Sequence, residues 1–359
     1  MANLDATQLL DVQSSNAFND KRMTPLGILN LTVDSTPFAD YILPSDREKF
    51  ATFSSLRTNN LLVLKDQTVT VNTTPGFPFI PSNLPETAQY SFTAVDVFSG
   101  FRHYPSQYAN SAADEQQIKN MVMTNVLYEM GNTVESLIAV ELEARKSQVM
   151  TEGLLQVSQG VGGGAYTFAA STLSINKAAQ QKTMFTSLNQ LFGANKIGGN
   201  YRVATNPSGL AVQYNELAIN GANQGINLQG LGGIDTSRIY ESHNISGGSD
   251  VFNGWAVRDG AIAVFENYPA DFRAGTSFAG KTWSISPTNL PFLNMRANIY
   301  VNNEATDATA LVAGGTDSNL IMTHFQEMAI WLRFYIVYRF NDDLSTIEND
   351  IIKIKGLTT

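Results

Sequence analysis

The side chains that could do chemistry in this 359-residue chain are few and widely spaced. Three histidines, His103, His243 and His324, lie far apart, and none belongs to a helical His-x-x-x-His pair. Neither a zinc site nor a serine triad therefore has local support. The chain has no cysteine, which excludes disulfides, thiolate metal sites and cysteine nucleophiles. We predict that the protein is not an enzyme and has no catalytic residues, no cofactor and no metal.

Two further patterns resemble functional motifs only in part. The glycine-rich run at residues 160–164 has no Lys-Ser or Lys-Thr after it, and it follows a predicted helix, whereas a phosphate-binding loop follows a strand. We interpret it as a hinge or turn. Asp46, Glu48, Asp342 and Asp343 lie in polar, loop-like sequence, where a solvated face is the expected role and an acid/base pair is rare.

The overall charge limits the partners of the chain. A formal net charge of -9, with 23 scattered Lys and Arg residues, argues against a sequence-independent nucleic-acid binder. A surface that only encloses nucleic acid needs no basic patch. Residues 1–7 contain Asp5 and no basic segment before an apolar core, so we expect no secretory signal, and no run of eighteen apolar residues predicts a membrane span.

One long amphipathic helix is predicted from Ser111 to about Met150. Ser111 can cap its first turn, and Asp114 and Glu115 place negative charge at the positive end of the helix dipole. Forty residues would span roughly 60 Å, and Gly131 is a point where the helix could bend or divide. Its apolar residues recur at intervals of three and four: Ile118, Val122, Val126, Met130, Val134, Leu137, Ile138 and Leu142.

The segments before this helix predict an arm and a long hairpin. Residues 1–60 are turn-rich and are interpreted as an extended arm, while residues 61–71 and 90–98 have strand-like patterns. The segment between these strands is broken by prolines, which lack an amide donor and cannot lie in a central strand. We therefore predict a long hairpin end of the kind that contacts a partner.

The segments after the helix predict a mixed α/β unit. A second helix is expected over residues 174–192, ended by Gly193, and a long terminal strand over residues 329–340 is expected to pair with a strand far back in the sequence. A turn at Asn206-Pro207-Ser208 should open a short helix. Short strands are predicted at residues 201–205, 239–240, 260–265, 283–285, 299–301 and 351–354.

This order of parts resembles the major capsid protein of tailed double-stranded-DNA bacteriophages, which has the α+β Johnson fold. The similarity covers nearly the whole chain, and its most specific part is residues 201–245, followed by residues 255–264, which look like a strand pair of the axial domain. The resemblance implies four parts: an N-terminal arm (1–60), an extended β-hairpin loop (61–105), a peripheral domain with the spine helix (106–172 and 325–359) and an axial domain (173–324).

The resemblance also implies a function. The chain would be the structural subunit of an icosahedral or prolate virion shell that assembles with itself into hexamers and pentamers in the host cytoplasm and encloses packaged DNA. Phe77, Phe79 and Ile80, near the proline-broken tip, would anchor it to a neighbouring subunit or would fold back on their own domain. Partners would include a separate scaffolding protein, a portal and a decoration protein. Lys65 lies at the base of the loop, so no covalent cross-link is predicted.

Two other classes of function fit the sequence less well. A carbohydrate- or receptor-binding module would use the Asn- and Gly-rich loops and the 13 tyrosines, but it would give no reason for the long helix. An α/β-hydrolase-like enzyme would use residues 206–221, but that segment has no Gly-x-Ser-x-Gly nucleophile motif.

Overall fold

The protein is represented by a computed structural model, which describes less than the full chain. The described residues are 26–32, 44–51, 57–64, 87–104, 112–146, 165–176, 188, 191–193, 200–209, 238–246, 251–267, 277–278, 281–282, 284–290, 295–307, 323–338 and 350–358.

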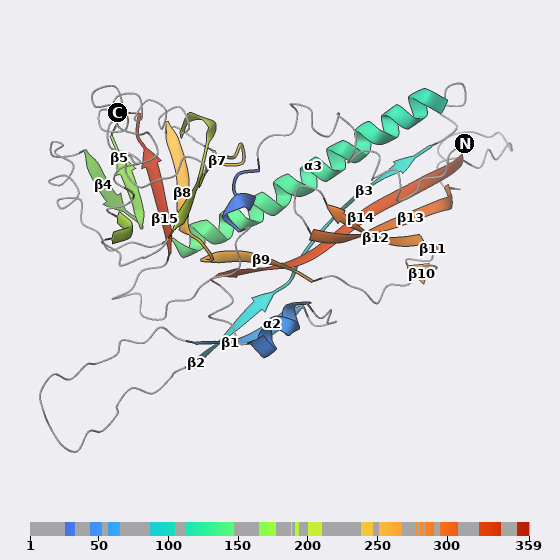
Figure 1. Cartoon of the computed structure of the whole chain (residues 1–359). Coiled ribbons are helices and arrows are strands. Elements are labelled where there is room, and N and C mark those ends of the chain that lie inside the picture. The colour runs from blue at the N-terminus through green and yellow to red at the C-terminus, as the bar shows by residue number, and fades with distance from the viewer. Residues whose placement is uncertain are drawn as a thin grey trace, which may run out of the picture.

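The centre of the fold is one long helix lying on one sheet. Helix α3, Ala112–Arg145, runs diagonally along a sheet with the strand order β12-β13-β14-β3, and β9 extends this sheet by pairing with the end of β14 (Figure 1). Every pairing in this sheet is antiparallel. The strands are β3 (Val95–His103), β9 (Ile262–Glu266), β12 (Ser284–Leu290), β13 (Met295–Asp307) and β14 (Thr323–Tyr338).

A second sheet lies at the C-terminal end of α3. It has six strands in the order β4-β5-β15-β8-β6-β7, with parallel pairing at β15–β5 and β6–β7 (Figure 1). Its strands come from three regions that are far apart in the sequence, residues 166–175, 201–258 and 351–356, and they pair in both directions. The strands are β4 (Tyr166–Ala169), β5 (Thr172–Ile175), β6 (Tyr201–Thr205), β7 (Ile239–Glu241), β8 (Phe252–Arg258) and β15 (Ile351–Gly356).

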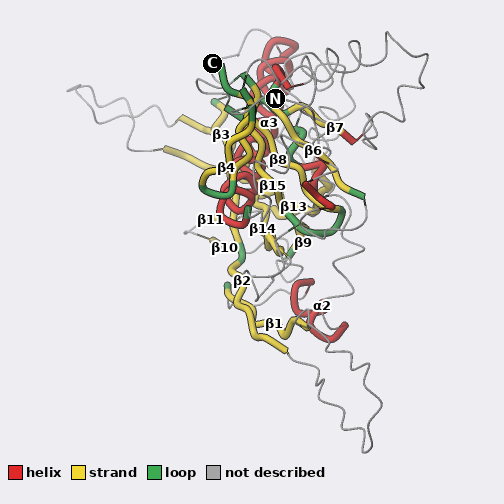
Figure 2. The backbone as a smooth tube through the Cα atoms, turned by 90° about the vertical axis from the view of Figure 1, so that its left-hand side faces the viewer, coloured by secondary structure: helices red, strands yellow, loops and turns green. Residues whose placement is uncertain are grey.

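A two-stranded ribbon projects from the first sheet, away from helix α3 (Figure 1). Strands β1, Thr58–Leu64, and β2, Thr87–Thr93, pair antiparallel, and β2 continues through Ala94 into β3. The short helix α2, Pro44–Ala51, packs beside the ribbon, and the side view shows both at the lower end of the molecule (Figure 2). The remaining elements are the 3-10 turn η1 (Leu29–Leu31) and the small hairpin β10 (Ser277–Phe278) with β11 (Lys281–Thr282).

The structure confirms the α+β fold class and the long helix, and it corrects the predicted stripe. The helix is continuous through Gly131, which is buried. In its first half the fully buried residues are Met123 and Leu127, whereas Val122 and Val126 are half-buried. The buried face of this half also includes polar residues. A search for apolar residues alone therefore assigned the face to Val122 and Val126, one position before the residues that are buried.

Two other sequence predictions are wrong in detail. Ser174 and Ile175, where the second helix was expected to begin, form the last two residues of strand β5. Residues 255–264, expected to form one strand pair, belong to two sheets: β8 lies in the six-stranded sheet, and β9 pairs with β14. The sharp turn that sends the chain from one sheet to the other contains Gly260, with φ of 80°. The expected distant partner of the terminal strand is β3, which pairs along β14 over nine residues.

Candidate assembly surfaces

An aromatic cluster fixes the base of the β1–β2 ribbon. Phe50 of α2 is 1% exposed, and its ring stacks on Phe265 of β9 with centroids 5.1 Å apart. It also meets the rings of Phe92 and Tyr335 edge-on, at 6.2 and 5.1 Å. One side chain thus joins α2, the ribbon and the large sheet, and offset and edge-on ring pairs of this kind add to the energy of burial. A ribbon of two strands is marginal alone, so this cluster is what gives it a fixed root.

A charged network at Asp96 ties the ribbon to the sheet at the same root. The Asp96 carboxylate accepts hydrogen bonds from Arg333 Nε at 2.5 Å, Trp331 Nε1 at 3.1 Å and Arg57 Nη2 at 2.5 Å. Burial alone would raise the pKa of Asp96, but the hydrogen bonds and charges of Arg333 and Arg57 hold it below its ordinary value. Arg57 precedes β1, so the ribbon's direction is coupled to the sheet through a carboxylate that stays charged.

Helix α2 adds a second set of bonds to the ribbon. Asp46 Oδ2 accepts a bond from the backbone N–H of Leu62 at 2.9 Å, and its Oδ1 pairs with Lys49 Nζ at 2.5 Å. Asn59 donates to Tyr335 Oη at 3.0 Å and to the Lys49 carbonyl at 3.1 Å. Asp46, expected from sequence on a solvated face, is therefore 3% exposed and structural. The aromatic cluster, the Asp96 network and helix α2 thus each hold the root of the ribbon in place.

The large sheet has one covered face and one that carries an exposed aromatic side chain. Val97 of β3 and Leu332 of β14 belong to the core cluster under α3. Phe98, the next residue of β3, is 77% exposed and lies opposite Trp331 in the strand register. Neighbouring residues of a strand point to opposite faces, so Phe98 and Trp331 share the face away from the helix. Phe98 is thus an exposed ring on the sheet face that α3 does not cover.

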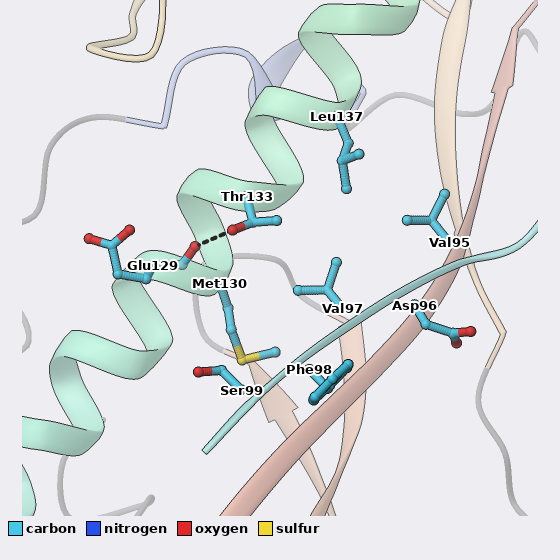
Figure 3. A pocket seen from close by; sticks show the side chains of 9 residues that line it. All are labelled: Val95, Asp96, Val97, Phe98, Ser99, Glu129, Met130, Thr133 and Leu137. Carbon is cyan, nitrogen blue, oxygen red and sulfur yellow. Dashed lines mark hydrogen bonds between the residues drawn. The ribbon is translucent and has the colours of Figure 1, made fainter. Parts of the chain in front are cut away.

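A groove runs between α3 and β3 beside this face. It has a volume of about 380 Å³, and Met130 and Leu137 extend into it from the helix toward Val97 of the strand (Figure 3). Its polar residues are Asp96, Ser99, Glu129 and Thr133, whose hydroxyl bonds the Glu129 carbonyl at 2.8 Å. The groove thus combines apolar side chains with the carboxylates of Asp96 on β3 and Glu129 on α3.

The helix itself presents further apolar side chains to solvent. Met121 is 52% exposed and Val140 is 65% exposed, and Leu62 on the ribbon is 43% exposed. Single exposed apolar residues are common on any protein. Here Leu62 lies on the projecting ribbon, and Met121 and Val140 lie on the long helix at the surface.

The N-terminal end of α3 is held by a buried polar cluster that the sequence did not predict. Glu115 Oε1 lies 2.7 Å from Lys119 Nζ and 3.0 Å from His103 Nε2, and Lys119 also donates to Gln326 at 3.2 Å. Glu115, predicted as a helix-start charge, does lie in the first turns of α3, where it is 6% exposed, and Lys119 is 1% exposed. The signal was available: both residues fall on the helical spacing that continues through Met123.

The structure places His103 and His243 in different parts of the fold. His103 belongs to the buried cluster at β3, and His243 lies 3.1 Å from Glu241 on the surface of another part of the fold. Phe77, Phe79 and Ile80 lie outside the described residues, as do Lys65, the glycine run at 160–164, and Asp342 and Asp343. Within the described ranges, no three His, Asp or Glu side chains are grouped so as to hold a metal ion, and no helix is both long and apolar enough to cross a membrane.

No family model and no curated protein matches the sequence. Solved structures do show similarity over most of the chain. Gordonia phage Cozz matches with a TM-score of 0.47 at 11% identity, covering 95% of this chain and 89% of that one. Mycobacterium phage Cain matches with a TM-score of 0.46 at 12% identity over 100% of both chains. The capsid of the cyanophage P-SCSP1u matches with a TM-score of 0.45 at 10% identity, covering 89% of each chain. Each of these three similarities covers most of both chains, at 10–12% identity.

Proposed function

We propose that the protein is a structural subunit of a phage capsid shell, which assembles with itself into hexamers and pentamers and encloses packaged DNA. The observation that carries this proposal is the rigidly rooted ribbon, β1–β2, projecting away from the sheet that supports α3 (Figures 1 and 2). A chain that fixes such a ribbon with Phe50 and Asp96, yet gives it only two strands, needs a second molecule to cover it.

The distribution of apolar surface supports the same function. Phe98 is exposed on the open sheet face, and Leu62, Met121 and Val140 are exposed on the ribbon and the helix. These positions lie on several sides of the subunit, and a closed shell requires each copy to contact several neighbours through different patches. A protein that binds one small ligand would instead need one concave, mostly apolar pocket with a few convergent polar groups.

We further propose that residues 61–105 act as the extended loop that reaches a neighbour, with Phe77, Phe79 and Ile80 as its anchors. The described root of this loop supports the idea, because β1 and β2 are held in one orientation and so have less conformational freedom to lose on binding. Separate scaffolding, portal and decoration proteins, assembly in the host cytoplasm and a virion location follow from this proposal. The net charge of -9 is compatible with enclosing DNA without a binding patch.

The test is the size distribution of the purified full-length chain at rising concentration, measured by light scattering with negative-stain imaging. We expect rings or closed particles from the wild type. The double variant F77S/F79S should remain a folded subunit that does not assemble, because it removes contact residues and not a core. The matched control T87S/Q89S changes two exposed positions of the same ribbon and should assemble normally.

Three outcomes would count against the proposal. A wild-type chain that stays a monodisperse monomer or trimer at every concentration contradicts assembly by the chain alone and favours a carbohydrate- or receptor-binding module. Normal assembly of F77S/F79S removes the loop tip from the contact. Unfolding of that variant, measured by circular dichroism, shows that these residues belong to the subunit's own core.

A further inference from the structure

Glu135 is a buried carboxylate where three distant segments meet. It lies on α3, next to residues 26–32 and to the turn after β7, and it is 0% exposed. Residues 26–32 are the first described part of the chain, and Ile28, Leu29 and Leu31 are buried in the same core cluster as the helix. This side chain is therefore the place where the N-terminal part of the chain is attached to the body.

Both oxygens of Glu135 accept hydrogen bonds from segments other than its own helix. Oε1 accepts the backbone N–H of Ile28 at 2.7 Å and that of Leu29 at 3.4 Å. Oε2 accepts the Ser242 hydroxyl at 2.8 Å and the Asn244 amide at 2.6 Å. Asn244 Nδ2 also lies 3.1 Å from Asn132 Oδ1 on the helix. All four groups that contact the carboxylate are uncharged donors.

Residues 26–32 pack closely against β7 and the turn that follows it. Leu26 forms an antiparallel bridge with Ser242, and a Cβ on Gly27 would collide with the backbone oxygen of Glu241. Arg202 donates to the carbonyl of Asn30 at 2.8 Å. Residues 26–32 are thus held by β6, by the turn after β7 and by Glu135, and their departure would open Glu135 to water.

We propose that Glu135 is a proton-binding latch, which holds residues 26–32 on the helix more tightly when the junction takes up a proton. The neutral acid suits the geometry. Its O–H can donate to Ser242, because a hydroxyl both donates and accepts, while the other oxygen keeps the bonds from Ile28 and Leu29. Asn244 retains its bond to Asn132. Closing the latch on the neutral form thus avoids the cost of burying a charge.

The direction of the effect follows from linkage. Burial raises the pKa of Glu135 above its ordinary value, even though the bonds from Asn244, Ser242 and Ile28 act in the opposite direction. In the open form the side chain is hydrated and its pKa is ordinary. The closed form therefore binds the proton more strongly, so the latch tightens as the pH falls from the raised pKa toward the ordinary one, and it is weakest above the raised pKa.

The charged groups on the neighbouring elements have partners of their own. Arg202 of β6 pairs with Asp259 at 3.1 Å, and in the turn Glu241 pairs with His243 at 3.1 Å. His243 lies in the same turn as Ser242 and Asn244, so the experiment must separate it from Glu135.

The test is hydrogen–deuterium exchange of the peptide covering residues 26–32 in the full-length protein, followed by mass spectrometry from about pH 8 to about pH 5 and corrected for intrinsic exchange. We expect the protection factor to rise as the pH falls, by at most about tenfold per pH unit, since one proton is taken up. E135Q, which is uncharged and of nearly equal size, should be well protected at every pH, and H243Q should behave as the wild type.

Either of two results would overturn the latch. One is a wild-type protection factor that does not change with pH. The other is an E135Q variant that keeps the wild-type dependence, which would place the titrating group elsewhere. A dependence that disappears in H243Q and persists in E135Q would assign the effect to His243. Because the readout is local exchange, it is independent of whether the protein assembles.

Discussion

Two buried glutamates on the same helix have opposite electrostatic environments. Glu115 and Glu135 are twenty residues apart on α3, about 30 Å along the axis, and they are 6% and 0% exposed. Glu115 has a cation, Lys119, at 2.7 Å, whereas Glu135 has only neutral donors. Burial acts to raise the pKa of both, but hydrogen bonds and charge from Lys119 and His103 bring that of Glu115 below its ordinary value, while that of Glu135 stays raised.

The comparison shows that burial alone does not decide how a carboxylate behaves. An opposite charge within hydrogen-bond distance keeps Glu115 ionised and makes it a structural lock, because the pair offsets the desolvation of both members. Neutral donors satisfy the hydrogen-bonding capacity of Glu135 without compensating its charge. The N-terminal end of the helix is thus fixed at all ordinary pH values, while the attachment of residues 26–32 is responsive.

The largest expected effect comes from removing the Lys119–Glu115 ion pair at the N-terminal end of α3. K119M should lower the free energy of unfolding by about 3–5 kcal/mol, because it leaves Glu115 buried with no cation other than a protonated His103. Denaturant unfolding measures this. The control E141A removes the half-exposed Glu141–Arg145 pair and should cost less than about 1 kcal/mol. Equal effects of the two variants would show that Glu115 is effectively solvated.

The second-largest effect comes from removing the Glu135 carboxylate, which accepts hydrogen bonds from uncharged donors only. E135A should destabilise the protein by about 2–3 kcal/mol, since the amide of Ile28 and the hydroxyl of Ser242 would lose their buried acceptor. E135Q should cost clearly less, because flips of Asn244 and Asn132 let the new amide find partners. The same denaturant experiment separates the two variants. A loss for E135Q as large as that for E135A would mean that the charge itself is required.

The pH dependence of unfolding should have opposite signs at the two sites. Because the pKa of Glu115 is lowered, its stabilising contribution is present above the ordinary pKa and is lost as the pH falls through the lowered value. Because the pKa of Glu135 is raised, its site becomes more favourable as the pH falls from the raised to the ordinary value.

Measuring denaturant unfolding at a series of pH values tests this difference. The stability deficit of E115Q relative to the wild type should shrink in acid, and that of E135Q should grow. Deficits that change in the same direction would remove the distinction between the two sites.

The smallest effect uses a position remote from both glutamates. Ala170 and Ser171 join β4 to β5 with φ of 48° and 55°, in the left-handed region that favours glycine and asparagine. A170N/S171G should therefore stabilise the protein by about 0.5–1 kcal/mol in thermal unfolding. The gain should be the same at every pH. A gain that varied with pH would show that the turn is coupled to one of the carboxylates.

The sequence predicted the elements better than their partners. The spacing of Met130, Val134 and Ile138 gave the helix, and alternation gave most strands, because both periods are local. The phase of the first half of the helix was missed because Glu115 and Lys119 occupy the buried face. A carboxylate is counted as polar in any apolar pattern, although a cation one turn away allows it to be buried.

The amino-acid sequence by itself determined that the chain is α+β, with one long helix and no local catalytic motif, since these properties depend on neighbours a few residues apart. Tertiary structure alone decided that β8 and β9 enter different sheets, that Asp96 roots the ribbon, and that Glu135 meets Ile28 across more than a hundred residues. The physical reason is that a buried polar group is set by donors from distant segments, and only the folded chain brings those donors within hydrogen-bond distance.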